Sequence, residues 1–105
     1  MRAGPGSTEA AGDARAAVGI TLKLFATLGD YLPRELDGRK RMHNQLAIEV
    51  PASCTVQQVI DRFAIPAGMA HLVLLNGVFV PRDARITRRL DAGDELAIWP
   101  PIAGG

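Results

Sequence analysis

One stretch of helical periodicity, set among segments that alternate like strands, most constrains how this chain folds. Apolar side chains recur there with the spacing of a single helix face, at Val56, Val59, Ile60 and Phe63. Thr55 stands just before them and Gln58 follows it by three residues, a capping-box pattern that predicts the start of a helix. Pro66 is predicted to end the helix or its extension. Because one helix covers only one face of a sheet, we expect a two-layer α+β domain.

Five segments with strand character surround this helix. In chain order they are residues 20–28, 46–50, 72–75, 78–80 and 96–99. The first two alternate apolar and polar side chains and are expected to pair antiparallel. The third is a continuous apolar run, predicted to be a buried strand, and Asn76-Gly77 predicts a hairpin between it and the fourth. This order fits a β-grasp arrangement, in which a mixed sheet of about five strands curls around one main helix.

Two segments lie outside this pattern. Residues 1–19 are rich in Ala and Gly and predict a disordered leader, because they cannot bury enough apolar surface to offset their ordering entropy. Residues 34–44 are polar and contain a run of three basic residues that begins at Arg39. We interpret this second segment as a loop, which is either simply solvated or guides an acidic partner. The folded domain is therefore predicted at residues 20–99.

The charge and cysteine content exclude several classes of function. Twelve Lys and Arg against eleven Asp and Glu leave a net charge of +1, which argues against a nucleic-acid-binding protein. The single cysteine, Cys54, excludes an internal disulfide framework and a cysteine-built zinc site, and we expect no bound metal. No apolar run approaches the roughly 20 residues needed to span a bilayer, and no secretory signal is visible. We therefore predict a cytoplasmic protein without membrane or nucleic-acid partners.

The polar residues show no recognisable catalytic signature. The sequence has neither a phosphate-binding glycine loop nor a local Ser, His and acid arrangement. Cys54 has no histidine near it in sequence and is interpreted as a small loop or core residue. His43 and His71 are interpreted as surface or strand-edge residues. Three acidic residues close in sequence are more typical of a turn than of a carboxylate site: Asp91, Asp94 and Glu95.

The C-terminus has a feature that fold stability does not require. Gly104-Gly105 end the chain, directly after a predicted strand and Pro100-Pro101. The prolines cannot donate to a strand ladder and hold the backbone extended. The two glycines then present the terminal carboxylate without side-chain bulk, so a narrow channel in another protein can accept it. We predict that residues 100–105 form a flexible arm.

The end of the chain resembles a known family. Residues 91–105, Asp-Ala-Gly-Asp-Glu-Leu-Ala-Ile-Trp-Pro-Pro-Ile-Ala-Gly-Gly, look like the C-terminal signature of the MoaD/ThiS sulfur carriers, which are ubiquitin-like β-grasp proteins. The hairpin at residues 74–78 and the helix start at Thr55-Val56 also match the family's layout, and the resemblance covers residues 20–105. The ending is closer to the small subunit of molybdopterin synthase than to the thiamin carrier. The leader and the basic loop are departures from the family pattern.

The resemblance implies a function and a set of partners. In this family a separate adenylyltransferase, related to ubiquitin-activating enzymes, uses ATP to adenylate the terminal glycine carboxylate. A sulfur donor of the desulfurase or rhodanese type then converts it to a thiocarboxylate, which passes sulfur to a precursor on another protein. By position, Gly105 carries the reactive group and Gly104 threads the activating site. The chain itself is expected to bind no cofactor and to be non-catalytic alone.

The resemblance leaves three functions open. The favoured one is sulfur transfer in the biosynthesis of the molybdenum- or tungsten-pterin cofactor, with the chain as small subunit beside a large synthase subunit. A second is a ubiquitin-like modifier joined through Gly105 to lysines of target proteins. A third is a sulfur carrier for thiamin thiazole or another sulfur metabolite.

The partner surface is expected on the sheet face that the helix leaves uncovered. Apolar side chains on that face would form a docking patch beside the arm. Phe25, Phe79 and Trp99 are the candidates, although Trp99 fits the core equally well. The arm adds the remaining expected partner-binding residues: Pro100, Pro101, Ile102 and Ala103.

Overall fold

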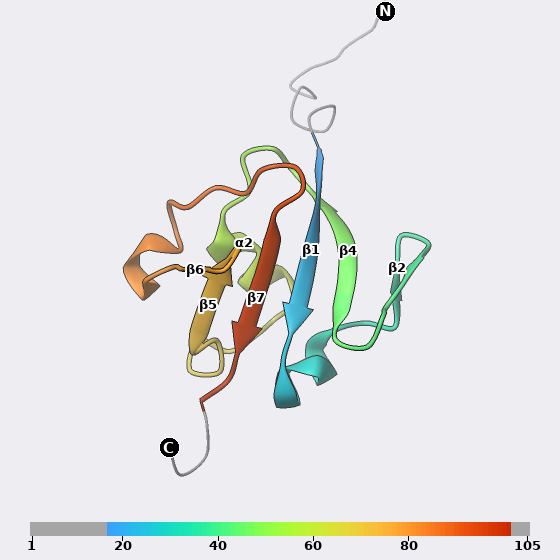
Figure 1. The fold of residues 1–105 in the computed structure, drawn as a ribbon, viewed down its shortest axis with the longest axis horizontal. Coiled ribbons are helices and arrows are strands. Elements are labelled where there is room, and N and C mark those ends of the chain that lie inside the picture. The colour runs from blue at the N-terminus through green and yellow to red at the C-terminus, as the bar shows by residue number, and fades with distance from the viewer. Residues whose placement is uncertain (1–16, 102–105) are drawn as a thin grey trace, which may run out of the picture.

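Five strands form one mixed sheet in the order β4-β1-β7-β5-β6 (Figure 1). The computed structural model describes residues 17–101. The sheet consists of β1 (Val18–Leu24), β4 (Gln45–Val50), β5 (Leu72–Leu75), β6 (Val78–Phe79) and β7 (Glu95–Trp99). β1 and β7 are parallel, and the other neighbouring pairs are antiparallel. The remaining elements are α2 (Val56–Arg62), η1 (Ala26–Tyr31), β2 (Glu35–Leu36), β3 (Arg39–Lys40) and η2 (Arg82–Ala84). The predicted α+β class is confirmed.

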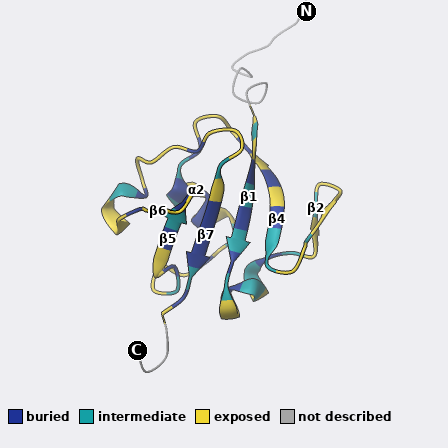
Figure 2. Ribbon diagram, viewed as in Figure 1, coloured by how far each residue is buried: buried dark blue, intermediate teal, exposed yellow. Residues whose placement is uncertain are grey.

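The core lies between the sheet and α2, which covers one face (Figure 1). Alternation along β1 turns Ile20, Leu22 and Leu24 inward, each 3% exposed or less, and buried and exposed positions alternate in the same way along β4 (Figure 2). The predicted helix stripe meets them, with Val56, Val59 and Ile60 buried and Phe63 partly buried. Each fully buried aliphatic side chain stabilises the fold by about 1.5–3 kcal/mol.

The ends of α2 follow from local hydrogen bonds. The predicted capping box is confirmed: the Gln58 backbone N–H donates to Thr55 Oγ1 at 3.3 Å, and the Thr55 N–H donates to Gln58 Oε1 at 2.8 Å. At the other end, Ala64 N–H donates to Asp61 O and Ile65 N–H to Ile60 O, which is a Schellman motif. The motif ends the helix at Arg62, so the prediction that Pro66 ends it was wrong.

Residues 34–44, predicted to be a loop, contain a short hairpin instead. β2 and β3 pair antiparallel around Asp37 and Gly38, whose φ angles are +53° and +78°. Positive φ at both central residues is the geometry of a two-residue type I′ turn, for which Asp-Gly is a preferred sequence. The polar composition concealed this hairpin, because neither strand has the apolar alternation that marks a half-buried strand.

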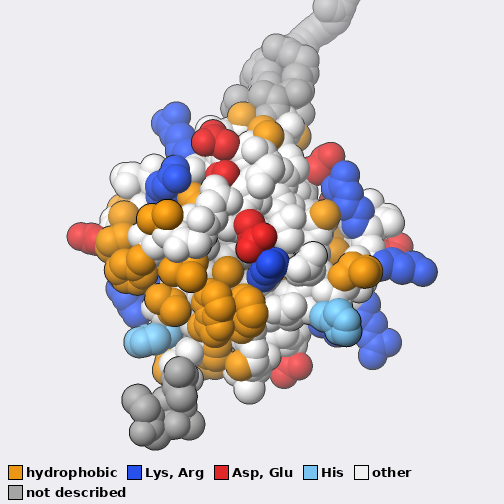
Figure 3. Space-filling model, viewed as in Figure 1, with side chains coloured by type: hydrophobic (Ala, Val, Ile, Leu, Met, Phe, Trp, Pro, Cys, Tyr) orange, Lys and Arg blue, Asp and Glu red, His pale blue; other side chains and the backbone are white. Residues whose placement is uncertain are grey.

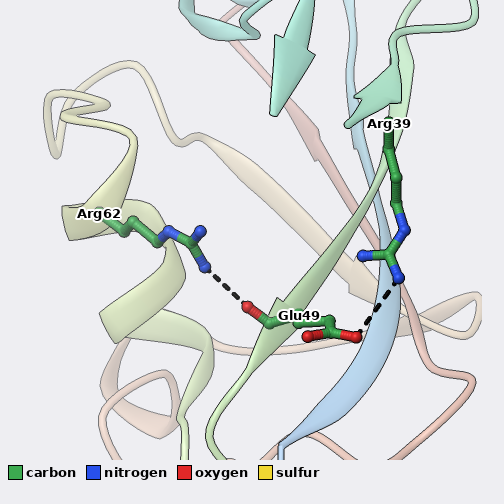
Figure 4. Close-up of polar contacts among 3 residues, drawn as sticks. All are labelled: Arg39, Glu49 and Arg62. Atoms are coloured by element: carbon green, nitrogen blue, oxygen red, sulfur yellow. Dashed lines mark hydrogen bonds and ion pairs between the residues drawn. The ribbon is translucent and has the colours of Figure 1, made fainter. Parts of the chain in front are cut away.

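Arginine side chains attach this hairpin to the η1 region and to β4, and attach α2 to β4. Arg41 Nη1 donates to the carbonyls of Gly29 and Leu32 at 3.0 and 2.9 Å. Arg39 Nη2 lies 3.3 Å from Glu49 Oε2, while Arg62 Nη1 donates to the Glu49 carbonyl at 2.9 Å (Figure 4). Side chains thus occupy part of the outer edge of β4, a common protection against unwanted strand pairing. Two of the three basic residues in the run that begins at Arg39 have these structural roles.

The first strand begins two residues before the predicted start of the domain at residue 20. β1 begins at Val18, because Val18 and Gly19 pair with Val50 and Glu49 of β4. Residues 1–16, most of the predicted leader, lie outside the described residues. Within residues 17–101, the structure contains no helix with the length and apolar character needed to cross a membrane.

Candidate functional site

The described chain leaves the sheet at the end of β7. The His71 N–H donates to the Trp99 carbonyl at 3.0 Å, and the Phe25 N–H donates to the Ile98 carbonyl at 3.0 Å. Pro100 lacks an N–H and so cannot continue the ladder. It is nevertheless buried, whereas Pro101 is exposed. Pro100, which the sequence assigned to the arm, is therefore covered by the domain.

The two aromatic residues beside this exit stack on each other. The ring centroids of Phe25 and Trp99 are 4.0 Å apart, with 6° between the ring planes. Both residues are half-buried, and both follow core residues, Leu24 and Ile98, which point to the opposite face. Such a pair contributes about 0.5–1.5 kcal/mol beyond its buried area. The structure thus resolves the alternative left open for Trp99, which lies on the uncovered sheet face and not in the core.

Further apolar side chains extend this pair across β7, β5 and β6. Leu72 is opposite Trp99, and Leu74 is opposite both Ala97 and Phe79. Leu72 is 37% exposed and Phe79 is 55% exposed. We call this surface the apolar face: Phe25, Leu72, Leu74, Phe79, Ala97 and Trp99. Figure 3 shows hydrophobic side chains gathered on the side of the molecule from which the chain runs to its C-terminus.

The apolar face has the properties of a docking surface. Large apolar side chains rarely stay together at a solvent-exposed surface without a partner. A salt bridge between Lys23 Nζ and Glu95 Oε2, 3.0 Å long, adds charged side chains from β1 and β7 to the same sheet face. An apolar centre with polar groups at its margin is the usual composition of a protein interface. Phe25, Phe79 and Trp99, the three residues proposed from the sequence, all lie within it.

The sequence did not indicate Leu72 and Leu74 as part of this surface. The continuous apolar run predicted a buried strand. In β5, however, Val73 and Leu75 are buried, Leu72 is exposed and Leu74 is intermediate. A run of leucine and valine has no polar residue to mark which positions face outward, so only pairing with Trp99 and Phe79 identifies them.

The arm residues predicted to carry the chemistry lie outside the described residues. They are Ile102, Ala103, Gly104 and Gly105. The structure therefore describes the base of the arm and the surface beside it, while the roles of the last four residues stay predictions.

Of the acidic residues near the start of β7, Asp94 serves the turn, as expected. Asp94 Oδ2 accepts a hydrogen bond from the Asp91 N–H at 2.8 Å, and Asp94 Oδ1 accepts one from Asn76 Nδ2 at 2.8 Å. Glu95 is in the salt bridge with Lys23. Because these carboxylates bind groups of the fold itself, a carboxylate site is not supported here.

Cys54 and the histidines also have the structural roles expected of them. Cys54 is 7% exposed, and burial raises the pKa of its thiol, an effect that the charge of Arg62 partly offsets. A buried thiol with a raised pKa is a poor nucleophile near neutral pH. His43 and His71 are exposed. The part of the chain that the structure describes contains no cluster of three or more His, Cys, Asp or Glu side chains suited to a metal ion.

Comparisons with known proteins agree on one family and one fold. The model of the ThiS family matches residues 22–105. No curated protein gives a significant match. Among solved structures, the HVO 2177 protein of Haloferax volcanii is 25% identical and superposes with a TM-score of 0.61, over 86% of this chain and 89% of that one.

Two crystal structures from the same organism show the same fold. SAMP1 of Haloferax volcanii is 23% identical, with a TM-score of 0.57 over 83% of this chain and 99% of that one. A structure of small archaeal modifier protein 1 is 22% identical, with a TM-score of 0.57 over 81% and 99% of the two chains. The predicted ubiquitin-like β-grasp fold is confirmed.

Proposed function

Because the chain belongs to the ThiS family, we propose that it is a sulfur carrier that works through the carboxylate of Gly105. The family and the fold support a ubiquitin-like sulfur carrier or modifier. Our more specific proposal is sulfur transfer in the synthesis of a molybdenum- or tungsten-pterin cofactor. The Pro-Pro-Ile-Ala-Gly-Gly ending is the sequence feature that favours this pathway.

One structural observation supports a carrier more than any other. The last strand ends beside an exposed apolar face, and only five residues separate Pro100 from the terminal carboxylate. Fully extended, five residues span about 17 Å, enough to reach a buried site in a protein docked on that face. The domain then supplies binding energy through the apolar face, while the glycines supply a thin reactive end.

The proposed chemistry requires little from the domain itself. A carboxylate is a poor electrophile, so the Gly105 carboxylate attacks the α-phosphorus of ATP on the activating enzyme and pyrophosphate leaves. The outer sulfur of a donor persulfide then displaces AMP from the acyl-adenylate and forms an acyl disulfide. A thiol cleaves this bond by thiol–disulfide exchange, which leaves a disulfide and the terminal thiocarboxylate. The carboxylates of Asp94 and Glu95 bind groups of the fold, and the Cys54 thiol is buried. This is consistent with a chain whose partners perform the catalysis.

The second candidate function is a protein modifier. Two similar structures are named for a modifier protein, and a modifier uses the same terminal carboxylate. In that case the activated Gly105 forms an isopeptide bond with a lysine amine of a target, whereas in the carrier it gives up sulfur and returns as free carboxylate.

One experiment separates the two candidates. The chain is incubated with ATP, its activating enzyme, a sulfur donor, and cell extract from which low-molecular-weight compounds have been removed. Products are analysed on denaturing, reducing gels and by mass spectrometry. The carrier predicts free chain bearing sulfur, which the large synthase subunit discharges when a pterin precursor is added. Covalent adducts that survive reduction and contain a Gly105–lysine linkage would instead establish the modifier.

A further inference from the structure

Residues 82–89, which we call the basic segment, carry an unusual concentration of positive charge. Four of the twelve Lys and Arg residues of the chain lie within these eight positions, against one acid, Asp83. The whole chain has a net charge of only +1. The charge of the protein is therefore unevenly distributed, and the basic segment, which includes η2, is a local source of positive potential.

The described part of the chain does not neutralise this charge. Within residues 17–101, the ion pairs join Lys23 to Glu95 and Arg39 to Glu49. Neither includes an arginine of the basic segment. Arg82, Arg88 and Arg89 are exposed. Their guanidinium groups are thus able to bind carboxylates of another molecule, each through two parallel hydrogen bonds.

A fourth arginine of the segment is buried. Arg85 is 3% exposed, and its Nη2 donates to the His71 carbonyl at 3.3 Å. Its Nε is buried without a hydrogen-bond partner. Burial and the charge of Arg82 both lower the pKa of this guanidinium, but arginine stays protonated in proteins. A buried cation without a carboxylate partner is costly, and an anionic group arriving from outside reduces that cost.

The basic segment is also connected to the base of the arm. Arg85 binds the His71 carbonyl, and the His71 N–H binds the Trp99 carbonyl, where the last strand ends. The segment follows Phe79 of the apolar face by only three residues, on the β6 side of the sheet (Figure 1). A protein that receives the arm is therefore well placed to touch the basic segment.

We propose that the basic segment is a docking surface for an acidic patch on the enzyme that adenylates Gly105, an inference that rests on the proposed function. Ile86, 67% exposed among the arginines, favours a protein surface over nucleic acid, since it offers apolar contact area. The adenylating enzyme meets the free carrier transiently, and complementary charge mainly accelerates such encounters. The apolar face is better suited to the longer-lived complex with the sulfur acceptor.

The test compares two double charge reversals of equal size. Arg82→Glu with Arg89→Glu changes the basic segment. Arg34→Glu with Lys40→Glu is the matched control, because these exposed residues lie in or beside the β2–β3 hairpin, at the opposite edge of the sheet. The rate of pyrophosphate release from ATP is measured with the adenylating enzyme at varied carrier concentration. Circular dichroism checks that both variants are folded.

The proposal makes a specific kinetic prediction. At about 50 mM salt, the basic-segment variant raises KM about tenfold with kcat unchanged, and the control raises it less than about twofold. At about 0.5 M salt the difference shrinks severalfold, since the Debye length falls below 5 Å. Equal KM values for the two variants would overturn the docking role of the basic segment and leave the proposed function intact. If the parent chain releases no pyrophosphate, the proposed function fails, and this inference fails with it.

Discussion

Replacement of Phe79 by Ala tests whether the apolar face binds the sulfur acceptor. Phe79 lies on the edge strand β6, opposite Leu74, and is 55% exposed. A fully buried phenylalanine removes about 200 Å² from water, so about 110 Å² remains available to a partner. At about 25 cal/mol per Å², this area is worth about 2.8 kcal/mol. We therefore expect Phe79→Ala to weaken binding of the large synthase subunit by up to about a hundredfold.

The same residue makes a smaller contribution to folding. The fold already covers about 90 Å² of Phe79, which contributes at most about 2 kcal/mol to the free energy of unfolding. The actual contribution is smaller, because the unfolded chain also buries some of this area. The variant is thus expected to stay folded, with a lowered melting temperature. Val78→Ala is the matched control, because Val78 is the neighbour of Phe79 on β6, is 67% exposed, and points to the other side of the strand.

Binding is measured by titration calorimetry with the purified large subunit, and folding by thermal unfolding. The expected result is a large loss of affinity for Phe79→Ala and a loss of less than about threefold for Val78→Ala. The reasoning is refuted if Phe79→Ala binds as tightly as the parent, or if both variants lose affinity equally. Unfolding of Phe79→Ala at room temperature would show that Phe79 serves the core instead.

Three further predictions concern the stability of the domain. Ala64 has a φ of +58° in the Schellman motif, where glycine is favoured, so Ala64→Gly should raise the free energy of unfolding by about 0.5–1 kcal/mol in urea titrations; a decrease would contradict the strain argument. Thr55→Ala should cost about 1 kcal/mol through loss of the helix cap, while Thr55→Ser retains most of it. Burial raises the pKa of Cys54, so the thiol ionises at a lower pH in the unfolded chain than in the folded protein. The free energy of unfolding should therefore fall as pH rises above about 8.5, and Cys54→Ala should remove this dependence.

The sequence predicted the framework of the fold because its strongest signals are local. The capping box at Thr55, the helix stripe and the Asn76-Gly77 turn each depend on a few neighbouring residues, and the structure contains all three. The β2–β3 hairpin escaped prediction because its two short strands are polar and lack apolar alternation, although Asp37-Gly38 is a local signal for its turn. The helix end was misplaced because a hydrogen-bonded motif with Ala64 at the glycine position ends it before Pro66.

The candidate site was predictable only in part, for similar reasons. Phe25, Phe79 and Trp99 stand out in sequence as large aromatic residues within predicted strands. Leu72 did not stand out. It is exposed because it pairs with Trp99 and so lies on the uncovered face, and this pairing is not visible in the sequence. Arg85 looks like any exposed arginine in the sequence, and only tertiary packing shows that it is buried.

The intact mass of the chain after activation tests the central claim most directly. The purified protein is incubated with ATP, the activating enzyme and a sulfur donor, beside a variant that lacks Gly105. Two further variants are compared, Gly104→Val and its matched control Gly68→Val. A Cβ added at Gly68 meets no atom within 4 Å, and Gly68 has no positive φ. The three variants should melt close to the parent, since none changes the core.

A carrier that works through Gly105 predicts a clear pattern of masses. The parent and Gly68→Val gain about 16 Da, as one oxygen of the terminal carboxylate is replaced by sulfur. The chain without Gly105 gains nothing, because its terminal carbon falls about 3.5 Å short of the activating site. Gly104→Val gains little, because bulk at this position hinders entry to a narrow channel. If the chain that lacks Gly105 acquires the added mass as readily as the parent, the protein is not a sulfur carrier of this kind.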